Sequence, residues 1–331
     1  MLKFRKISIL FFVMILIVAL IGCRAAERPE DDQTPDQAEE GEQPPIPDEI
    51  TRGEGEEPVL KVYIHETGEI REMSIEEYLI PVVAGEMTND WPEEALAAQA
   101  ILARTFVMEF ITDKGGSKYE GAHVSTDIEE AQAWSEEEVN DLVTQAVETT
   151  RGQVMVYEGQ YVKSWFHAHA GMQTATAQEG LGFEAEEPPY IQVIESPDSQ
   201  EAPEDDANWT ETFTKAEIIA AAQESGQEPG DFTAIEVAET GPSGRATQLQ
   251  IGEATVAAPA FRIALDSTRM KSTKLESVQV EGDQVTMSGT GYGHGVGMSQ
   301  WGAYQMAQDG SSAEDIVNHY FKDVQIMKLW E

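Results

Sequence analysis

The sequence predicts an α+β fold, built as one mixed domain behind a segment that does not fold. Segments with the period of a strand and segments with the period of a helix follow one another without the regular alternation of parallel-sheet proteins. The apolar fraction of the 331 residues is 41%, which is enough for a packed core. Residues 24–58, in contrast, hold almost nothing apolar. The folded domain is therefore predicted to span residues 59–331.

The N-terminus has the pattern of an export signal. A basic start precedes an apolar run from Ile7 to Leu20, and the sequence Leu-Ile-Gly-Cys ends at Cys23. This pattern predicts a signal peptide over residues 1–22. Its end resembles the lipobox of bacterial lipoproteins, which implies that Cys23 is lipidated. An uncleaved anchor is the alternative, although the run is short for a spanning helix of about 20 residues. Both interpretations place the rest outside the cytoplasmic membrane, and lipidation would hold it at the outer face.

The charge balance excludes some partners and explains the segment after the cysteine. There are 61 acidic residues against 21 basic ones, for a net charge of −40. Nucleic acid is excluded, since phosphate binding needs Lys and Arg stripes. Residues 23–58 are rich in Glu, Asp and Pro, so they are predicted to form a disordered, extended tether. The acidity also suggests adaptation to high salt. Cys23 is the only cysteine, so no disulfide can form within the chain.

The first predicted elements of the domain are a hairpin and two helices. Alternation predicts a strand over residues 59–64 and a returning strand over 70–73. A helix is expected from Ser74, with acidic residues in its first turn. The next helix is the clearest, with Asp90 as its cap and Pro92 near its first position. Its apolar face contains Leu96, Ala100, Ala103, Val107 and Phe110.

Later elements are predicted from shorter signals. A hairpin is expected over 153–166, turning at Glu158-Gly159, and another over 277–288, turning at Gly282-Asp283. An acidic loop is expected at 196–208. Helices are expected over 215–225, 299–308 and 313–322.

A single carboxylate stands out in Val-Val-Ala-Gly-Glu-Met, where Glu86 lies among apolar neighbours just before the long helix. Burial beside apolar groups raises the pKa of a carboxyl group, so that it can act as a general acid near neutral pH. An ordinary surface glutamate would give the same local pattern.

Two further segments carry candidate binding residues. His167 and His169 are two apart, so on a strand they would face the same side, where they could bind a metal or a substrate. Packed loop histidines are the alternative. In Gly-Tyr-Gly-His-Gly-Val-Gly-Met-Ser-Gln-Trp-Gly, Tyr292, His294 and Trp301 offer polar groups and aromatic faces that suit sugar rings. The glycines alone would also fit a tight structural corner. The segment lacks the spacing of a phosphate or dinucleotide loop.

Together these segments resemble the SpoIID/LytB family, named for stage II sporulation protein D and an amidase-modifier protein. The most specific pieces are Val-Val-Ala-Gly-Glu-Met followed by Ala-Leu-Ala-Ala-Gln-Ala-Ile-Leu-Ala-Arg-Thr-Phe, and the segment 291–307. The resemblance covers nearly all of residues 59–331. It implies a peptidoglycan lytic transglycosylase that cleaves MurNAc–GlcNAc bonds and leaves 1,6-anhydro-MurNAc ends. The implied enzyme needs no cofactor.

The resemblance also implies roles for named residues. The family's catalytic glutamate falls on Glu86, which would act as acid and then as base, because the sugar's own 6-hydroxyl is the nucleophile. The residues expected to bind the glycan strand in a cleft are Arg104, His167, His169, Tyr292, His294, Gln300 and Trp301. Arg104 could instead be structural. Family members act on glycan stripped of stem peptides, which implies a cell-wall amidase as partner.

One departure from the family concerns zinc. Some relatives hold zinc in a stretch resembling Cys-Asp-x-x-His-Cys-Gln, but here Ser125 and Ala131 occupy the cysteine positions, and His123 is the one plausible remnant. No metal is therefore expected. The alternatives to the enzyme are a non-catalytic wall-binding protein that stimulates an amidase and a metal-dependent hydrolase that uses the histidines.

Overall fold

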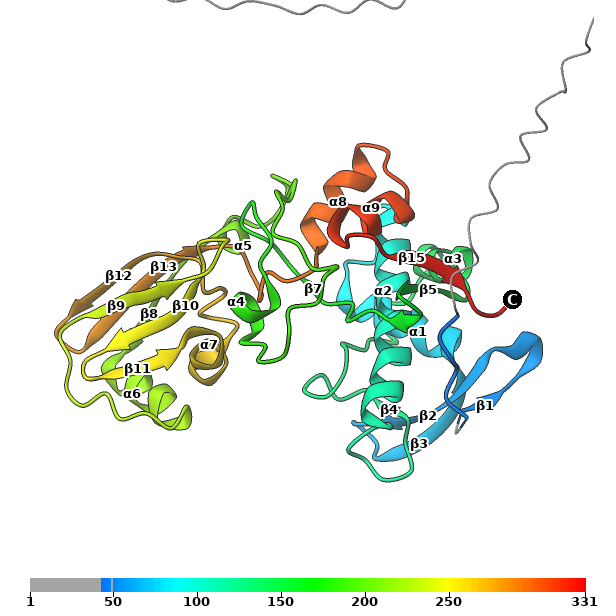
Figure 1. The fold of residues 1–331 in the computed structure, drawn as a ribbon, viewed down its shortest axis with the longest axis horizontal. Helices are drawn as coiled ribbons and strands as arrows, with labels where there is room; N and C mark the ends of the chain where they lie inside the picture. Colours follow the sequence, from blue (N-terminus) through cyan, green and yellow to red (C-terminus); the bar gives the residue numbers. More distant parts are fainter. Residues whose placement is uncertain (1–42, 49) are drawn as a thin grey trace, which may run out of the picture. The chain divides into compact units, whose positions relative to one another are not determined.

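The computed structural model describes residues 43–48 and 50–331 (Figure 1). The predicted signal peptide, Cys23 and most of the predicted tether lie outside these residues. In the described part, helices mix with small sheets whose strands pair mainly antiparallel, so the α+β prediction is confirmed.

The elements fall into two groups around two hydrophobic cores. The first group consists of β1 (Thr51–Arg52), η1 (Glu54–Glu56), β2 (Pro58–Ile64), β3 (Glu69–Ser74), α1 (Ile75–Glu86), α2 (Glu93–Lys114), β4 (Val124–Ser125), α3 (Asp141–Thr149), β5 (Gln153–Tyr157), β6 (Gln160–Tyr161), β7 (Phe166–His167), α4 (Ala177–Leu181), β14 (Met298–Ser299), α8 (Gln300–Gln308), α9 (Ala313–Tyr320) and β15 (Gln325–Lys328). The second group consists of α5 (Glu204–Ala207), β8 (Asn208–Thr214), α6 (Lys215–Glu224), β9 (Ile235–Thr240), β10 (Ala246–Ile251), β11 (Ala254–Ala257), α7 (Ala258–Asp266), β12 (Leu275–Glu281) and β13 (Gln284–Thr290).

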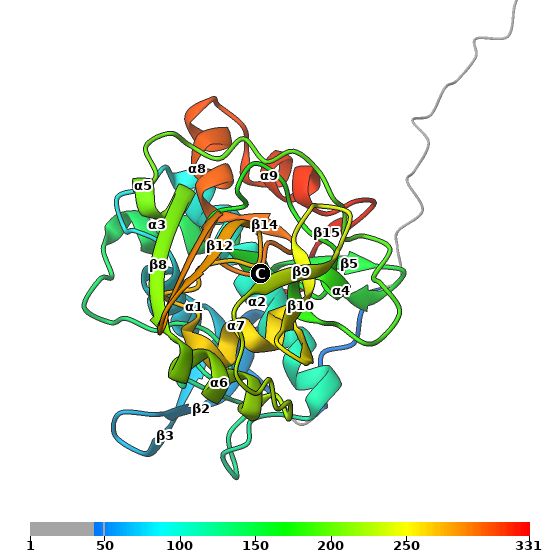
Figure 2. The same ribbon diagram turned by 90° about the vertical axis from the view of Figure 1, so that its left-hand side faces the viewer.

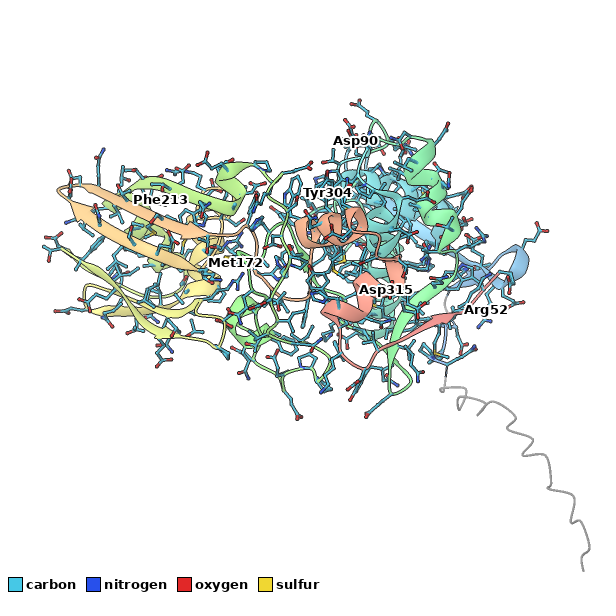
Figure 3. The ribbon with its side chains drawn as sticks, turned by 90° about the horizontal axis from the view of Figure 1, so that it is seen from above. Arg52, Asp90, Met172, Phe213, Tyr304 and Asp315 are labelled. Atoms are coloured by element: carbon cyan, nitrogen blue, oxygen red, sulfur yellow. The ribbon has the colours of Figure 1, made fainter. Side chains whose placement is uncertain are left out.

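The second group is a layered β unit. Two sheets, with strand orders β11-β10-β9 and β12-β13-β8, enclose Phe213, Leu249, Phe261 and other apolar side chains together with α6 and α7. Figure 3 labels Phe213, which is 1% exposed. The chain leaves the first group after α4 and returns through β14, which pairs parallel to β7. The glycine-rich segment 291–297 is therefore the return crossing between the two groups.

Helix α2 is the centre of the first core. It packs against α1, α3, α8, α9 and β5, and Figure 2 shows it behind α7. Its many buried alanines leave little side-chain bulk, so these neighbours can approach closely. Among the described residues α2 is the one helix long and apolar enough to cross a membrane, but 83% of its apolar window is buried inside the protein. It is thus a core helix.

The local signals at the start of the domain are confirmed, with one exception. Strands β2 and β3 pair antiparallel, and Ser74 caps α1 in a box with Glu77, whose carboxylate accepts from the Ser74 N–H at 2.9 Å. The prediction that Asp90 caps α2 is wrong. Asp90, labelled in Figure 3, is exposed in a turn closed by the Trp91 N–H on the Thr88 carbonyl, and α2 begins after Pro92 without a side-chain cap.

The folded part begins earlier than residue 59. Ile46 and Ile50 are 9% and 3% exposed and belong to the first core, and β1 pairs antiparallel with β2. The predicted tether, which ran to residue 58, is therefore too long. Ile46 and Ile50 are isolated in a polar segment, and the local composition does not show that they pack against the first core.

The remaining element predictions are mostly confirmed. β5–β6 turns at Glu158-Gly159, both with positive φ, and β12–β13 turns at Gly282-Asp283, while α6, α8 and α9 lie where expected. The hairpin predicted over residues 153–166 is shorter in the structure, where β6 ends at Tyr161. Helix α5 interrupts the predicted acidic loop. The longer elements that the sequence did not predict include α3, β8, β9, β10, β11 and α7.

Candidate functional site

Glu86 is the last residue of α1 and presents its carboxylate to a loop. The helix ends there because Met87 takes an extended conformation. One carboxylate oxygen, Oε1, accepts a hydrogen bond from the Ala133 backbone N–H at 2.7 Å. Val82, Val83 and Met87 around it are buried, and Glu86 itself is partly buried. The carboxylate therefore has one polar donor in an otherwise apolar setting.

This setting controls the protonation of Glu86. Burial raises the pKa of the Glu86 carboxyl from 4.5 to about 7, while the Ala133 N–H opposes the rise by stabilising the charged form. No acidic neighbour among the described residues is a cause of this shift. The group can thus give or take a proton near neutral pH, as a general acid–base catalyst must.

A glycine lets the loop lie directly on the helix. A Cβ at Gly85 would come within 2.8 Å of the Trp134 nitrogen. The same loop donates from the Ser135 N–H to the Pro81 carbonyl at 2.9 Å, and the Trp134 ring lies 5.3 Å from the Tyr78 ring. Close approach of two backbones therefore directs the Ala133 N–H to Glu86.

The C-terminal motif reaches Glu86 through one side chain. Gln300 at the start of α8 is 8% exposed, and its Nε2 donates to the Glu86 carbonyl at 2.9 Å. Next to it, the half-buried Trp301 packs on Trp91, with ring centroids 4.5 Å apart, and on Tyr304, which Figure 3 labels. Two predicted binding residues, Gln300 and Trp301, thus lie at the end of α1.

The other predicted binding residues form a separate cluster in the crossing segments. His167 Nδ1 lies 3.1 Å from the Val296 carbonyl, and the rings of His167 and His294 are 5.7 Å apart. His169 and Tyr292 exchange backbone hydrogen bonds, and the His169 ring accepts from the Gly171 N–H at 3.0 Å. Burial lowers the pKa of His294 to about 3, so its ring is neutral. These contacts hold segments 166–171 and 291–297 together, and a role in binding glycan stays a prediction.

Arg104 does not belong to the site. Its guanidinium is fully buried and pairs with Glu76 through Nε at 3.0 Å and Nη2 at 2.6 Å. It also donates to the carbonyls of Gln153 and Val147. The prediction that Arg104 binds substrate is therefore wrong, because its buried guanidinium donates to groups of α1, α3 and β5 and joins these elements to α2.

A cavity of about 530 Å³ opens beside the loop. Ala133 and Trp134 line it, together with polar side chains of the β2–β3 hairpin such as His65 and Arg71. Glu86 is not among its lining residues, but Ala133 lines the cavity and also donates to Glu86. Sequence reasoning missed Ala133 and Trp134, because a backbone donor and its loop have no residue-type signal.

The residues in the place of the zinc stretch do not fit a zinc ion. Ser125 and Ala131 provide no thiolate, and the ring nitrogen Nδ1 of His123 accepts from the Lys61 N–H at 3.1 Å. The nearby carboxylates of Asp127 and Glu130 already accept hydrogen bonds from several protein donors. Within residues 43–48 and 50–331, no group of three or more metal-ligating side chains could hold an ion.

The glycines of the crossing segment are required by geometry. Gly297 has φ +72, and a Cβ there would lie 2.0 Å from the Trp165 carbonyl oxygen, which itself accepts from the Met298 N–H. We expect Gly297→Ala to lower the free energy of unfolding by about 3 kcal/mol or more. Gly244→Ala, at φ +81 with open space, is the matched control and should cost about 1 kcal/mol. Urea unfolding measures both, and equal losses would contradict the steric argument.

Comparison with known proteins places the chain in a family. Residues 63–157 match the model of the SpoIID family, described as stage II sporulation protein. Stage II sporulation protein D of Bacillus amyloliquefaciens is 28% identical over 84% of this chain and 83% of its own length, and that of Bacillus subtilis is 29% identical over 81% and 78%. The chain belongs to the SpoIID family.

Two further relatives and a second family model also match the chain. An uncharacterized protein of Brachyspira hyodysenteriae is 30% identical over 78% of this chain and 68% of its own length. An amidase enhancer of Bacillus subtilis is 26% identical, but the match covers 39% of that protein. Residues 157–297 match a domain of unknown function (DUF8618). Glu86 and its loop lie within the SpoIID match, the histidine cluster lies within the second match, and Gln300 and Trp301 follow both.

Proposed function

We propose that this SpoIID family member is a peptidoglycan lytic transglycosylase with Glu86 as its acid–base residue. The observation that carries the proposal is the Glu86 carboxyl, whose pKa burial raises to about 7 with no second carboxylate contributing. Hydrolytic glycosidases use two carboxylates, one of them to activate water or to form a covalent intermediate. A lone acid fits a reaction in which the substrate supplies its own nucleophile.

The reaction would run in two proton transfers. Protonated Glu86 gives its proton to the oxygen of the MurNAc–GlcNAc bond as that bond breaks and charge develops on the MurNAc ring. The resulting carboxylate then takes the proton of the MurNAc 6-hydroxyl, whose oxygen bonds to the anomeric carbon. The products are a 1,6-anhydro-MurNAc end and a free GlcNAc hydroxyl, and Glu86 is protonated again without water.

The surroundings of Glu86 are suited to an extended strand. At the end of α1, Trp301 offers an aromatic face on which a sugar ring can stack, and Gln300 offers a polar side chain. The separate cluster of Tyr292, His167, His169 and His294 would bind another part of the strand. The cavity beside Trp134 has room for a sugar residue. The enzyme would work at the outer face of the cytoplasmic membrane, anchored through a lipid on Cys23, on glycan stripped by an amidase.

Digestion of amidase-treated peptidoglycan tests the proposal. We expect the wild-type protein to release fragments that end in anhydro-MurNAc, identified by their mass. Glycan that stays intact under conditions in which the protein binds it would instead support the second candidate, a non-catalytic wall-binding protein that stimulates an amidase. That candidate is favoured by the similarity to an amidase enhancer.

The raised pKa also predicts the pH dependence. Since the first step needs the protonated carboxyl, kcat/KM should fall about tenfold per pH unit above about pH 7. His294 is not the cause of such a fall, because burial lowers its pKa to about 3. Steady-state rates on a soluble glycan measure the profile, and a level rate from about pH 6 to about pH 9 would contradict the role of Glu86.

A further inference from the structure

The loop that donates to Glu86 is held on α1 at one end. Trp134 packs against Tyr78, and the Ser135 N–H donates to the Pro81 carbonyl. These contacts fix the chain after Ala133. The position of the Ala133 N–H also depends on the chain before it, which is held by hydrogen bonds to a carboxylate.

A carboxylate gathers the chain on the other side. Glu130 accepts at Oε2 from Ser117 Oγ at 2.7 Å and from Ser125 Oγ, and at Oε1 from the Lys118 N–H at 2.5 Å. We call these four residues the Glu130 clamp. Its donors come from the loop after α2 and from β4, so it joins three stretches of chain at one point.

A neighbouring carboxylate supports the clamp. Asp127 accepts from Lys118 Nζ and Tyr119 Oη, both at 2.8 Å. Its carbonyl accepts from the N–H groups of Glu130 and Ala131, which closes a tight turn. Burial by itself would raise the pKa of Glu130, but the donors from Ser117, Ser125 and Lys118 bring it below its usual value, so the clamp is ionised at neutral pH.

We infer that Glu130 is a positioning residue for Glu86, and that the clamp holds the Ala133 loop by hydrogen bonds, in the stretch that corresponds to the zinc-holding stretch of some relatives. Only two residues separate Glu130 from Ala133, so a shift at the clamp moves the N–H that stabilises the charged form of Glu86. The clamp therefore sets the proton affinity of Glu86 without touching substrate. The effect of the clamp on catalysis rests on the proposed function, but its effect on the position of the Ala133 loop does not.

The Ala133 amide itself reports the effect. In NMR spectra of the full chain labelled with ¹⁵N-alanine, the amide proton of Ala133 should titrate with Glu86 near pH 7. Glu130→Gln replaces one acceptor oxygen by a donor, so the loop loses part of its hold. We expect the midpoint seen at Ala133 to rise by about one pH unit, and the alkaline limb of kcat/KM to rise with it.

Two variants make the comparison sharp. Glu129→Gln removes the same charge from an exposed neighbour and should leave the midpoint unchanged. Ser125→Ala removes one of the clamp's donors and should raise the midpoint by less than Glu130→Gln. If Glu130→Gln does not fold, the midpoint measured in Ser125→Ala tests the inference in its place. A wild-type midpoint in a folded Glu130→Gln, or in Ser125→Ala when Glu130→Gln fails to fold, would overturn the inference.

Chelation tests the replacement of zinc. The purified full chain should contain less than a tenth of an equivalent of zinc, and its melting temperature should not change with EDTA. One equivalent of zinc, or a melting temperature lowered by EDTA, would overturn the inference. A shifted Ala133 midpoint together with undigested glycan would instead refute the proposed function and leave the clamp standing.

Discussion

Glu86→Gln is expected to lower kcat on peptide-stripped glycan by about 10²- to 10⁴-fold, the range for loss of a positioned acid–base group. The amide can still accept from the Ala133 N–H, so the geometry of the loop should persist. It cannot give a proton to the glycosidic oxygen, and it cannot take one from the 6-hydroxyl. Both steps therefore fail together. Rates of anhydro-MurNAc release measure the loss.

Two controls separate chemistry from folding. Glu72→Gln, exposed on β3, removes the same charge away from the site and should leave kcat unchanged. Because the folded pKa of Glu86 is raised, its ionisation destabilises the folded state as pH rises from 4.5 towards 7. Glu86→Gln should thus be at least as stable as wild type at about pH 8. A variant that keeps its rate within about threefold would contradict the assignment.

Arg104→Met is expected to lower the free energy of unfolding by about 3–5 kcal/mol. The substitution removes the partner of Glu76 in the first core and leaves that carboxylate buried with only neutral donors, among them the Gly152 N–H and Trp330 Nε1. Urea unfolding measures the cost. Since Arg104 lies away from the site, the folded fraction should bind glycan with an unchanged Kd.

The double variant Arg104→Met, Glu76→Gln isolates the charge. Removing both members avoids an unpaired buried carboxylate, so we expect it to recover part of the loss. A variant at Arg104 with wild-type stability and weakened glycan binding would show instead that the arginine serves the substrate.

Elements with local signals could be predicted from the sequence. The capping box of Ser74 and Glu77 and the turns at Glu158-Gly159 and Gly282-Asp283 contain their own hydrogen bonds or backbone preferences. Asp90 shows the limit of such signals, because α2 begins at Glu93, directly after Pro92, and Asp90 lies too early to cap it. The motif glycines were recognisable in the same way, as positions where a side chain would collide.

Long-range contacts could not be predicted. Glu86 was found by its motif, but its donor Ala133 lies 47 residues later and is a backbone group. Arg104 follows α1 closely in sequence and resembled a site residue, yet its partner Glu76 faces the core rather than the site. Ile46 looked solvent-exposed in a polar segment, and a surface formed elsewhere buries it. Each outcome depends on which faces meet in three dimensions.

Digestion in H₂¹⁸O tests the central claim most directly. If Glu86 transfers a proton from the 6-hydroxyl of MurNAc to its own carboxylate, water takes no part in breaking the strand. The account predicts fragments one water lighter than hydrolysis products, ending in 1,6-anhydro-MurNAc and free of ¹⁸O, released by wild type and not by Glu86→Gln. Reducing ends that carry ¹⁸O would show a hydrolase and contradict the mechanism.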